Sequence, residues 1–354
     1  MKNRTREICT SGSVEDEAGQ AAHLLGHRRQ FLHLAVCAAV LSASHWSLSA
    51  HAQEWPARPI TMVIPTAAGG GTDLVGRILA ERLSEILRRP VIVENVGNSV
   101  AATDRVAKAA PDGYRFSLSG VAQIAYHPTI YKMPVYNSRT DLAPVALIAE
   151  QPYLLVTRTN FPANDLREFA AYAKANQHKL QYGSGAGTGS GNHLSCEMLN
   201  SAIGVKIAHV PYRDIGLLTQ DMIADRVDYQ CPLPGIMIPL IQTNRVKGIA
   251  LLGKARLTAL PNLATAEEQG LADFEAPNWF GIFFPKGTPE AIIRKLNLAA
   301  VAAMDTPRVQ ERLAALAATV VAADRRSPEY LQRFVLSQID KWAVLIKAAG
   351  VVIE

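Results

Sequence analysis

Two glycine-rich segments, PTAAGGGTD at residues 65–73 and SGAGTGSGNHL at residues 184–194, constrain the fold of this chain more than any other feature. Each follows a short apolar stretch that reads as a buried strand, and each leads directly into a helical pattern. Such a turn directs backbone N–H groups into one concavity, and the N-terminus of the helix behind it favours an anion. More than a hundred residues separate the segments, so we expect them in different lobes, facing one small carboxylate.

Strand and helix patterns alternate on both sides of these segments, which predicts an α/β fold with mainly parallel sheets. The expected strands lie at 60–64, 91–94, 114–118, 153–157, 180–182, 207–210, 246–252 and 279–284. Three Ser/Thr-Pro pairs after residue 287 predict the starts of three final helices, since proline suits the first helical position. We predict a first lobe from residues 53–157 and 277–354 and a second lobe from 158–276, joined by two hinge crossings.

Residues 1–52 are predicted to be an export signal. Two arginines at 28–29 precede an apolar run at 31–41, and Ala50-His51-Ala52 fits the small-x-small pattern of a cleavage site. The run is much shorter than the roughly 20 residues of a spanning helix, although a retained anchor is the alternative. Cleavage near Ala52 places the mature chain in the periplasm; the paired arginines leave Sec and twin-arginine export both open.

The charges of residues 53–354 bear on a nucleic-acid partner, and the two cysteines of this region bear on disulfide formation. Residues 53–354 carry 31 basic and 27 acidic side chains without a basic stripe, so nucleic-acid binding finds little support. Cys196 and Cys231 could pair in an exported chain, but we expect two buried thiols, because nothing in the sequence brings them together.

Familiar catalytic and cofactor motifs do not fit. Ser190 stands where a dinucleotide-binding turn needs its third glycine, and no lysine follows either segment as a phosphate-binding loop requires. The flanking glycines of a nucleophile elbow are also missing, and the histidines lack metal-ligand spacing. We therefore expect no cofactor, no metal and no enzyme activity.

Several of these residues could have a structural role without contacting a ligand. The first segment could be a tight turn without a ligand, and His193 could be a satisfied residue of the first helical turn rather than a donor. Residues 212–214, at another strand end, could line the cleft or form a solvated turn.

The chain resembles the extracytoplasmic solute-binding proteins of tripartite tricarboxylate transporters, the Bug family. The resemblance runs from Trp55 to the C-terminus through the following stretches: WPARPITMVIP, GGGTD, VIVEN, PDGY, YGSGAGTGSGNHL, VPY, LPN, EEQG and WFGIFFPKGTP. It implies a two-lobed periplasmic-binding-protein fold of type II, a carboxylate ligand, and delivery to a permease with a large and a small subunit by a monomeric protein.

The resemblance also implies a set of ligand-binding residues, because the family holds a carboxylate with backbone amides, hydroxyls and waters. Carried onto this chain, the set comprises Thr66, Ala67, Gly70, Gly71, Asp73, Ala122, Ser184, Gly187, Thr188, Ser190, His193 and Asp214. The chain departs from the family at VGNSVAA (96–102), where a GAGG-like stretch is usual, and at Asp214, where VPYKG becomes VPYRD. These departures argue against transferring one dicarboxylate specificity.

Two other functions use the same residues. An exported α/β hydrolase-like enzyme would use Ser190 and His193, and a ligand-presenting sensory partner would use the same pocket.

Overall fold

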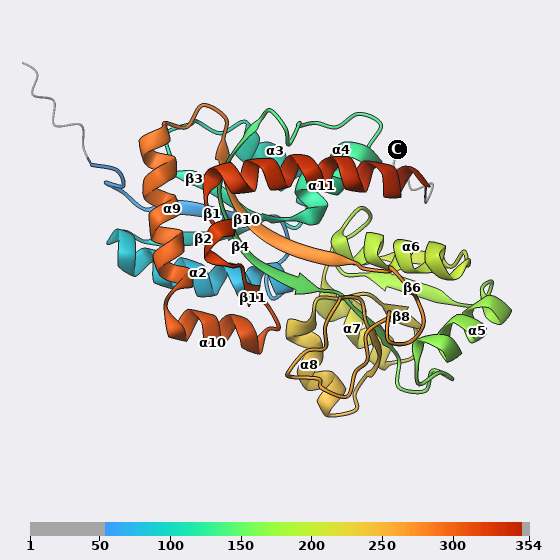
Figure 1. Ribbon diagram of the computed structural model, residues 1–354. Helices are drawn as coiled ribbons and strands as arrows, with labels where there is room; N and C mark the ends of the chain where they lie inside the picture. The colour runs from blue at the N-terminus through green and yellow to red at the C-terminus, as the bar shows by residue number, and fades with distance from the viewer. Residues whose placement is uncertain (1–53, 349–354) are drawn as a thin grey trace, which may run out of the picture. The chain divides into compact units, whose positions relative to one another are not determined.

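The computed structural model describes residues 54–348, so the predicted signal and its cleavage site lie outside the described residues. A six-stranded sheet has the order β11-β4-β10-β3-β1-β2 (Figure 1). Strand β1 (Ile60–Ile64) pairs in parallel with β2 (Val91–Asn95) and β3 (Arg115–Gly120). The other strands, β10 (Pro277–Pro285), β4 (Leu142–Pro152) and β11 (Thr319–Val320), pair antiparallel.

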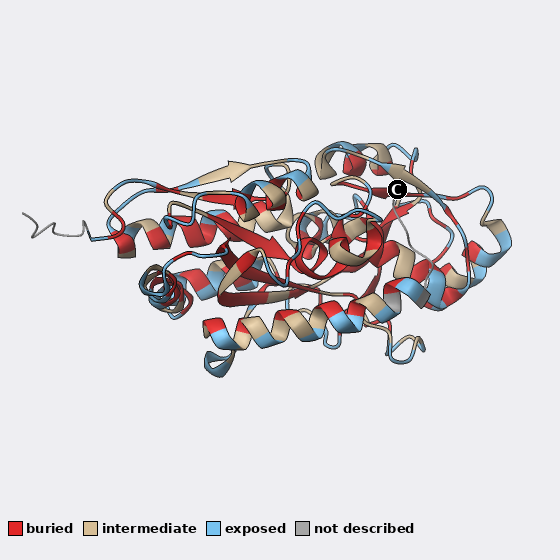
Figure 2. Cartoon of the chain, turned by 90° about the horizontal axis from the view of Figure 1, so that it is seen from above, coloured by how far each residue is buried: buried red, intermediate tan, exposed pale blue. Residues whose placement is uncertain are grey.

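Helices cover both faces of this sheet, and together they form the first lobe. Apolar side chains of α2 (Gly71–Leu87), α9 (Glu290–Met304) and α10 (Pro307–Ala315) share one core cluster with the sheet. A second cluster joins the opposite face to α3 (Ser99–Ala107), to a π-helical turn η1 (Ala122–Tyr126) with α4 (His127–Ile130), and to α11 (Pro328–Ala348). Burial falls mainly on the strands and on the inner helix faces (Figure 2).

A five-stranded sheet with the order β7-β6-β8-β5-β9 forms the second lobe. Strand β6 (Gln181–Ser184) is parallel to β7 (Ala208–Pro211) and β8 (Tyr229–Gln230), whereas β5 (Leu154–Thr157) is antiparallel to β8 and to β9 (Lys247–Leu251). Its helices are α5 (Leu166–Asn176), α6 (Gly191–Ile203), α7 (Ile215–Ile223) and α8 (Pro234–Gln242). The mixed α/β fold with two helix-flanked sheets is as predicted, but parallel pairing is limited to one three-strand group in each sheet.

The chain crosses between the two sheets on two neighbouring strands. Pro152, at the end of β4, is the register partner of Pro277, at the start of β10. Just beyond, the N–H of Tyr153 donates to the carbonyl of Ala276 at 3.4 Å. The strand predicted at 153–157 was expected in the first lobe, but β5 pairs within the second sheet. The apolar pattern of a buried strand does not say which of two sheets it joins, so the crossing is one strand earlier than expected.

The two cysteines form a disulfide, which corrects the expectation of free thiols. Cys196 lies on α6 and Cys231 follows β8, and their Cα atoms are 5.4 Å apart. Both side chains are fully buried. The packing of α6 against the second sheet brings the two residues together across 35 positions of sequence, a proximity with no local signal.

No helix within residues 54–348 has the length and apolar character needed to cross a lipid bilayer.

Candidate functional site

The two glycine-rich segments fold into loops of the same form, one in each lobe. Residues 65–70 connect β1 to α2, and residues 185–190 connect β6 to α6. Gly69 and Gly189 occupy equivalent places with φ of 82° and 80°. The N-cap residues that follow, Gly70 and Ser190, also match, with ψ of 164° and 162°. The left-handed φ explains why glycine stands at both places, because a side chain would be strained there.

A side chain four residues further on anchors each of these glycines. The N–H of Gly69 donates to Oδ2 of Asp73 at 2.8 Å, and the N–H of Gly189 donates to Nδ1 of His193 at 3.2 Å. Burial alone would raise the pKa of Asp73, but hydrogen bonds from Arg77, Gly69 and Asn95 lower it overall. Both predicted site residues therefore use a polar atom to hold their own loop.

Aromatic rings behind the second loop keep His193 neutral. The rings of His193 and His209 lie 4.1 Å apart, and Tyr182 stacks on both. Burial, reinforced by His209, lowers the pKa of His193 to about 3, and burial lowers the pKa of His209 to about 4. Neutral imidazole is the form that Gly189 requires, because Nδ1 must accept the hydrogen bond of its amide.

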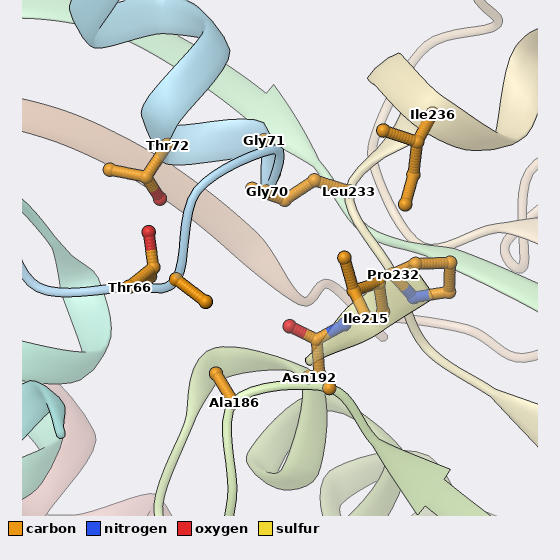
Figure 3. A pocket seen from close by; sticks show the side chains of 12 residues that line it. Thr66, Gly70, Gly71, Thr72, Ala186, Asn192, Ile215, Pro232, Leu233 and Ile236 are labelled. Carbon is orange, nitrogen blue, oxygen red and sulfur yellow. The ribbon is translucent and has the colours of Figure 1, made fainter. Parts of the chain in front are cut away.

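A small cavity lies between the two loops (Figure 3). It measures about 50 Å³ as space open to the centre of a water molecule. The first lobe lines it with Thr66, Ala67, Gly70, Gly71 and Thr72, and the second with Gly185, Ala186, Asn192, Ile215, Pro232, Leu233 and Ile236. Oγ1 of Thr66 is buried and has no hydrogen-bond partner among the described residues. The side chain of Asn192 extends from the second lobe toward the Thr66 side.

Backbone amides around this cavity are also unused. Within residues 54–348, the N–H groups of Thr66, Ala67 and Gly70 donate to no protein acceptor, and neither do those of Ala186 and Thr188. Thr66, Ala67, Gly70 and Ala186 are half-buried and Thr188 is exposed, so these amides are accessible to a solute that enters between the loops. Unused donors from both lobes at one cavity are therefore suited to an anion, and the following helices α2 and α6 add the favourable end of their dipoles.

Contacts between the lobes beside the cavity include those of His127 and Leu233. His127 on α4 donates from Nε2 to the carbonyl of Gly189 at 3.0 Å, linking the first lobe to the second loop. Leu233 packs against the start of α2, where a Cβ added to Gly71 would lie 2.8 Å from its Cδ1. Glycine at position 71 thus permits the close approach of the lobes.

The predicted site residues fall into two groups. Thr66, Ala67, Gly70 and Gly71 line the cavity, and Gly187 and Thr188 line a second, larger cavity next to it. The others support the surrounding structure. Oγ of Ser184 donates to the Gly187 carbonyl, Oγ of Ser190 accepts from the His193 backbone, and Asp214 caps α7 through Gly216 and Leu217. Ala122 is buried in η1 and lines neither cavity.

Other lining residues did not emerge from sequence analysis. Three of them, Gly185, Ala186 and Asn192, belong to the glycine-rich segment at 184–194. Taking every residue of that segment as a candidate would have included them. Pro232 and Leu233 immediately precede α8 and Ile236 lies on it, in a stretch that carries no ligand-binding pattern. No group of three or more potential metal-ligating side chains occurs in the part of the chain that the structure describes.

Comparison with known proteins gives consistent results. A family model described as "Tripartite tricarboxylate transporter family receptor" matches residues 75–351. A relative from Agrobacterium vitis, a UPF0065 protein in the TAR-I ttuE-ttuC' intergenic region, is 35% identical, covering 88% of this chain and 91% of the relative.

Two solved structures are similar over nearly their whole length. The periplasmic binding protein BugD is 36% identical with a TM-score of 0.80, covering 84% of this chain and 99% of BugD. MatC from Rhodopseudomonas palustris, solved with bound malate, is 34% identical with a TM-score of 0.78, covering 82% of this chain and 100% of MatC.

Proposed function

This chain belongs to the family of tripartite tricarboxylate transporter receptors, and from that premise we propose that it captures a small organic carboxylate between its two lobes. The single observation that carries the proposal is the pair of matching loops, residues 65–70 and 185–190, which place unused amides at one cavity. The malate bound to MatC supports a carboxylate as the ligand.

Amides rather than cations suit reversible capture. A buried cation would need its own desolvation, whereas preoriented N–H dipoles bind the anion without burying a second charge. A hydrogen bond to a charged group contributes roughly 1.5–3 kcal/mol. Three or four of them, shared by the two loops, are enough for about micromolar affinity after the entropic cost of association.

Closure is proposed to occur at the two crossings, residues 152–153 and 276–277. Pro152 and Pro277 are paired at the ends of β4 and β10, and Tyr153 and Ala276 are hydrogen-bonded just beyond them, so a rotation there would move one sheet relative to the other without breaking either. Because the two loops contribute donors from opposite lobes, a bound carboxylate is fully satisfied only when the lobes meet. The ligand therefore stabilises the closed state.

Family membership supports a proposal for the partner and the compartment. We propose that the chain is exported to the periplasm by its N-terminal segment, with cleavage near Ala52, and acts there as a monomer. It would deliver its ligand to a membrane permease with a large and a small subunit.

The proposed role is binding without turnover. An exported hydrolase would need the Ser190 hydroxyl next to the His193 ring as its base. Instead, Oγ of Ser190 accepts from the His193 backbone N–H, and Nδ1 of the ring accepts from Gly189. A bound carboxylate should accordingly be recovered chemically unchanged.

Substitution of Gly71 by valine tests capture by closure. A Cβ at this position would lie 2.8 Å from Cδ1 and 2.9 Å from Cβ of Leu233 in the other lobe. Overpacking of this kind costs about 1–3 kcal/mol, so we expect carboxylate affinity to fall about 10- to 100-fold, as measured by titration calorimetry.

A second substitution provides the control for this experiment. Leu233→Ala in the Gly71→Val background removes Cγ and Cδ1 at the contact and should restore part of the affinity. Unchanged binding in Gly71→Val, or a loss that Leu233→Ala does not relieve, would contradict closure at this point.

A further inference from the structure

The larger cavity beside the glycine loops has a different character from the small one. It measures about 580 Å³ on the same scale, and the two cavities share Ala186. The first lobe contributes the start of α3 and Tyr131, and the second contributes Gly187, Thr188 and residues 211–213. A ligand whose carboxylate lies between the loops can therefore extend past Ala186 into this space.

Arg213 is the one charged residue among those that line this larger cavity. Its guanidinium forms no ion pair within the described part of the chain, although most arginines there have a carboxylate partner. The neighbouring Tyr212 hydroxyl is occupied, since it donates to Asp221 at 2.7 Å. Arg213 is thus a cation available to a ligand.

No acidic side chain lines the larger cavity to offset this charge. The departure at Asp214 does not supply one, because Oδ1 of Asp214 accepts from the backbone N–H groups of Gly216 and Leu217 at the start of α7. The N-terminus of α3, at Asn98 and Ser99, faces the same cavity and carries the positive end of its dipole. The balance of charge favours an anionic group.

On the basis of the proposed function, we infer that Arg213 determines specificity by binding a second, distal carboxylate of the ligand in the larger cavity. The loops hold the proximal carboxylate through amides, and Arg213 holds the distal one through a charge-assisted pair. The preferred solute is accordingly an extended dicarboxylate, and a monocarboxylate of equal chain length binds more weakly.

Titration calorimetry with adipate and hexanoate, which differ by one terminal carboxylate, tests this assignment. We expect the unchanged protein to bind adipate at least tenfold more tightly than hexanoate. Arg213→Gln should remove most of that difference by weakening adipate alone, and Arg213→Lys should retain part of it, because the charge remains without the bidentate geometry.

Arg245→Gln is the matched control, because Arg245 is an exposed cation of the same lobe that lines neither cavity. It should leave both affinities unchanged. Equal affinity of the unchanged protein for adipate and hexanoate overturns the distal subsite alone. An equal loss of affinity for both ligands in Arg213→Gln, or no loss of affinity for either, overturns it as well. Failure of the unchanged protein to bind any carboxylate overturns the proposed function and this inference together.

Discussion

Acidification from pH 7 to pH 5 is expected to lower the free energy of unfolding by at least about 4 kcal/mol, the contribution of two buried histidines that are held neutral in the folded chain. Burial lowers the pKa of His127 to about 4, although its hydrogen bond to Gly189 opposes the shift. Burial, with a contribution from His209, lowers the pKa of His193 to about 3. In the unfolded chain both rings titrate near pH 6.5.

The direction of this change in stability follows from the pH range in which the folded and the unfolded chain bind protons. Well above pH 6.5 neither state protonates these rings, so the stabilisation is complete. Between pH 6.5 and about 4 the unfolded chain takes up protons that the folded chain excludes, and each histidine costs about 2 kcal/mol by pH 5. The pKa of His209 is lowered too, so its titration acts in the same direction.

Urea denaturation at a series of pH values measures this effect. In His127→Gln the free energy of unfolding should fall less between pH 7 and pH 5. The difference should be about 2 kcal/mol at pH 5, the contribution of one histidine. His178→Gln is the matched control, because His178 is exposed on the second lobe. This variant should show the same dependence of the free energy of unfolding on pH as the unchanged protein. The same slope in all three proteins would contradict the account of buried neutral histidines.

Loss of the disulfide is expected to lower the free energy of unfolding by about 3–4 kcal/mol. Cys196 and Cys231 are 35 residues apart, and a cross-link over such a loop removes a corresponding amount of chain entropy from the unfolded state. The bridge also has a place in the site. Cys196 lies on the helix that begins at the second loop, and Cys231 precedes Pro232 and Leu233, which line the small cavity.

Comparison of Cys196→Ala/Cys231→Ala with the unchanged protein measures this contribution. Under oxidising conditions the variant should unfold at lower urea and bind its carboxylate more weakly. With a reductant present, the two proteins should become alike. Equal stability of the two proteins without reductant would show that the bridge makes no net contribution to stability.

The two glycine loops were predictable from sequence because they depend on local chemistry. Left-handed glycines between an apolar strand and an amphipathic helix leave a clear pattern, as at Gly69 and Gly189. The roles of Asp73 and His193 were less apparent, since an anchoring side chain and a ligand-binding one are the same residue types. The signal was nevertheless present: each stands four positions after the left-handed glycine of its loop.

Features that depend on long-range packing were not predictable. Residues 142–152, LAPVALIAEQP, form the long strand β4, yet they carry no clear alternation because both faces of the strand are largely covered. The cavity-lining Leu233 stands between two prolines at the start of helix α8, and this stretch gives no functional pattern. The disulfide and the place of β5 in the second sheet required knowledge of which elements become neighbours.

A crystal structure of the protein with the carboxylate that it binds most tightly tests the central claim most directly. The account predicts carboxylate oxygens about 2.7–3.2 Å from amide nitrogens of both loops, residues 65–70 in one lobe and 185–190 in the other. A carboxylate held by the amides of only one loop, or by a cationic side chain with both loops empty, would contradict it.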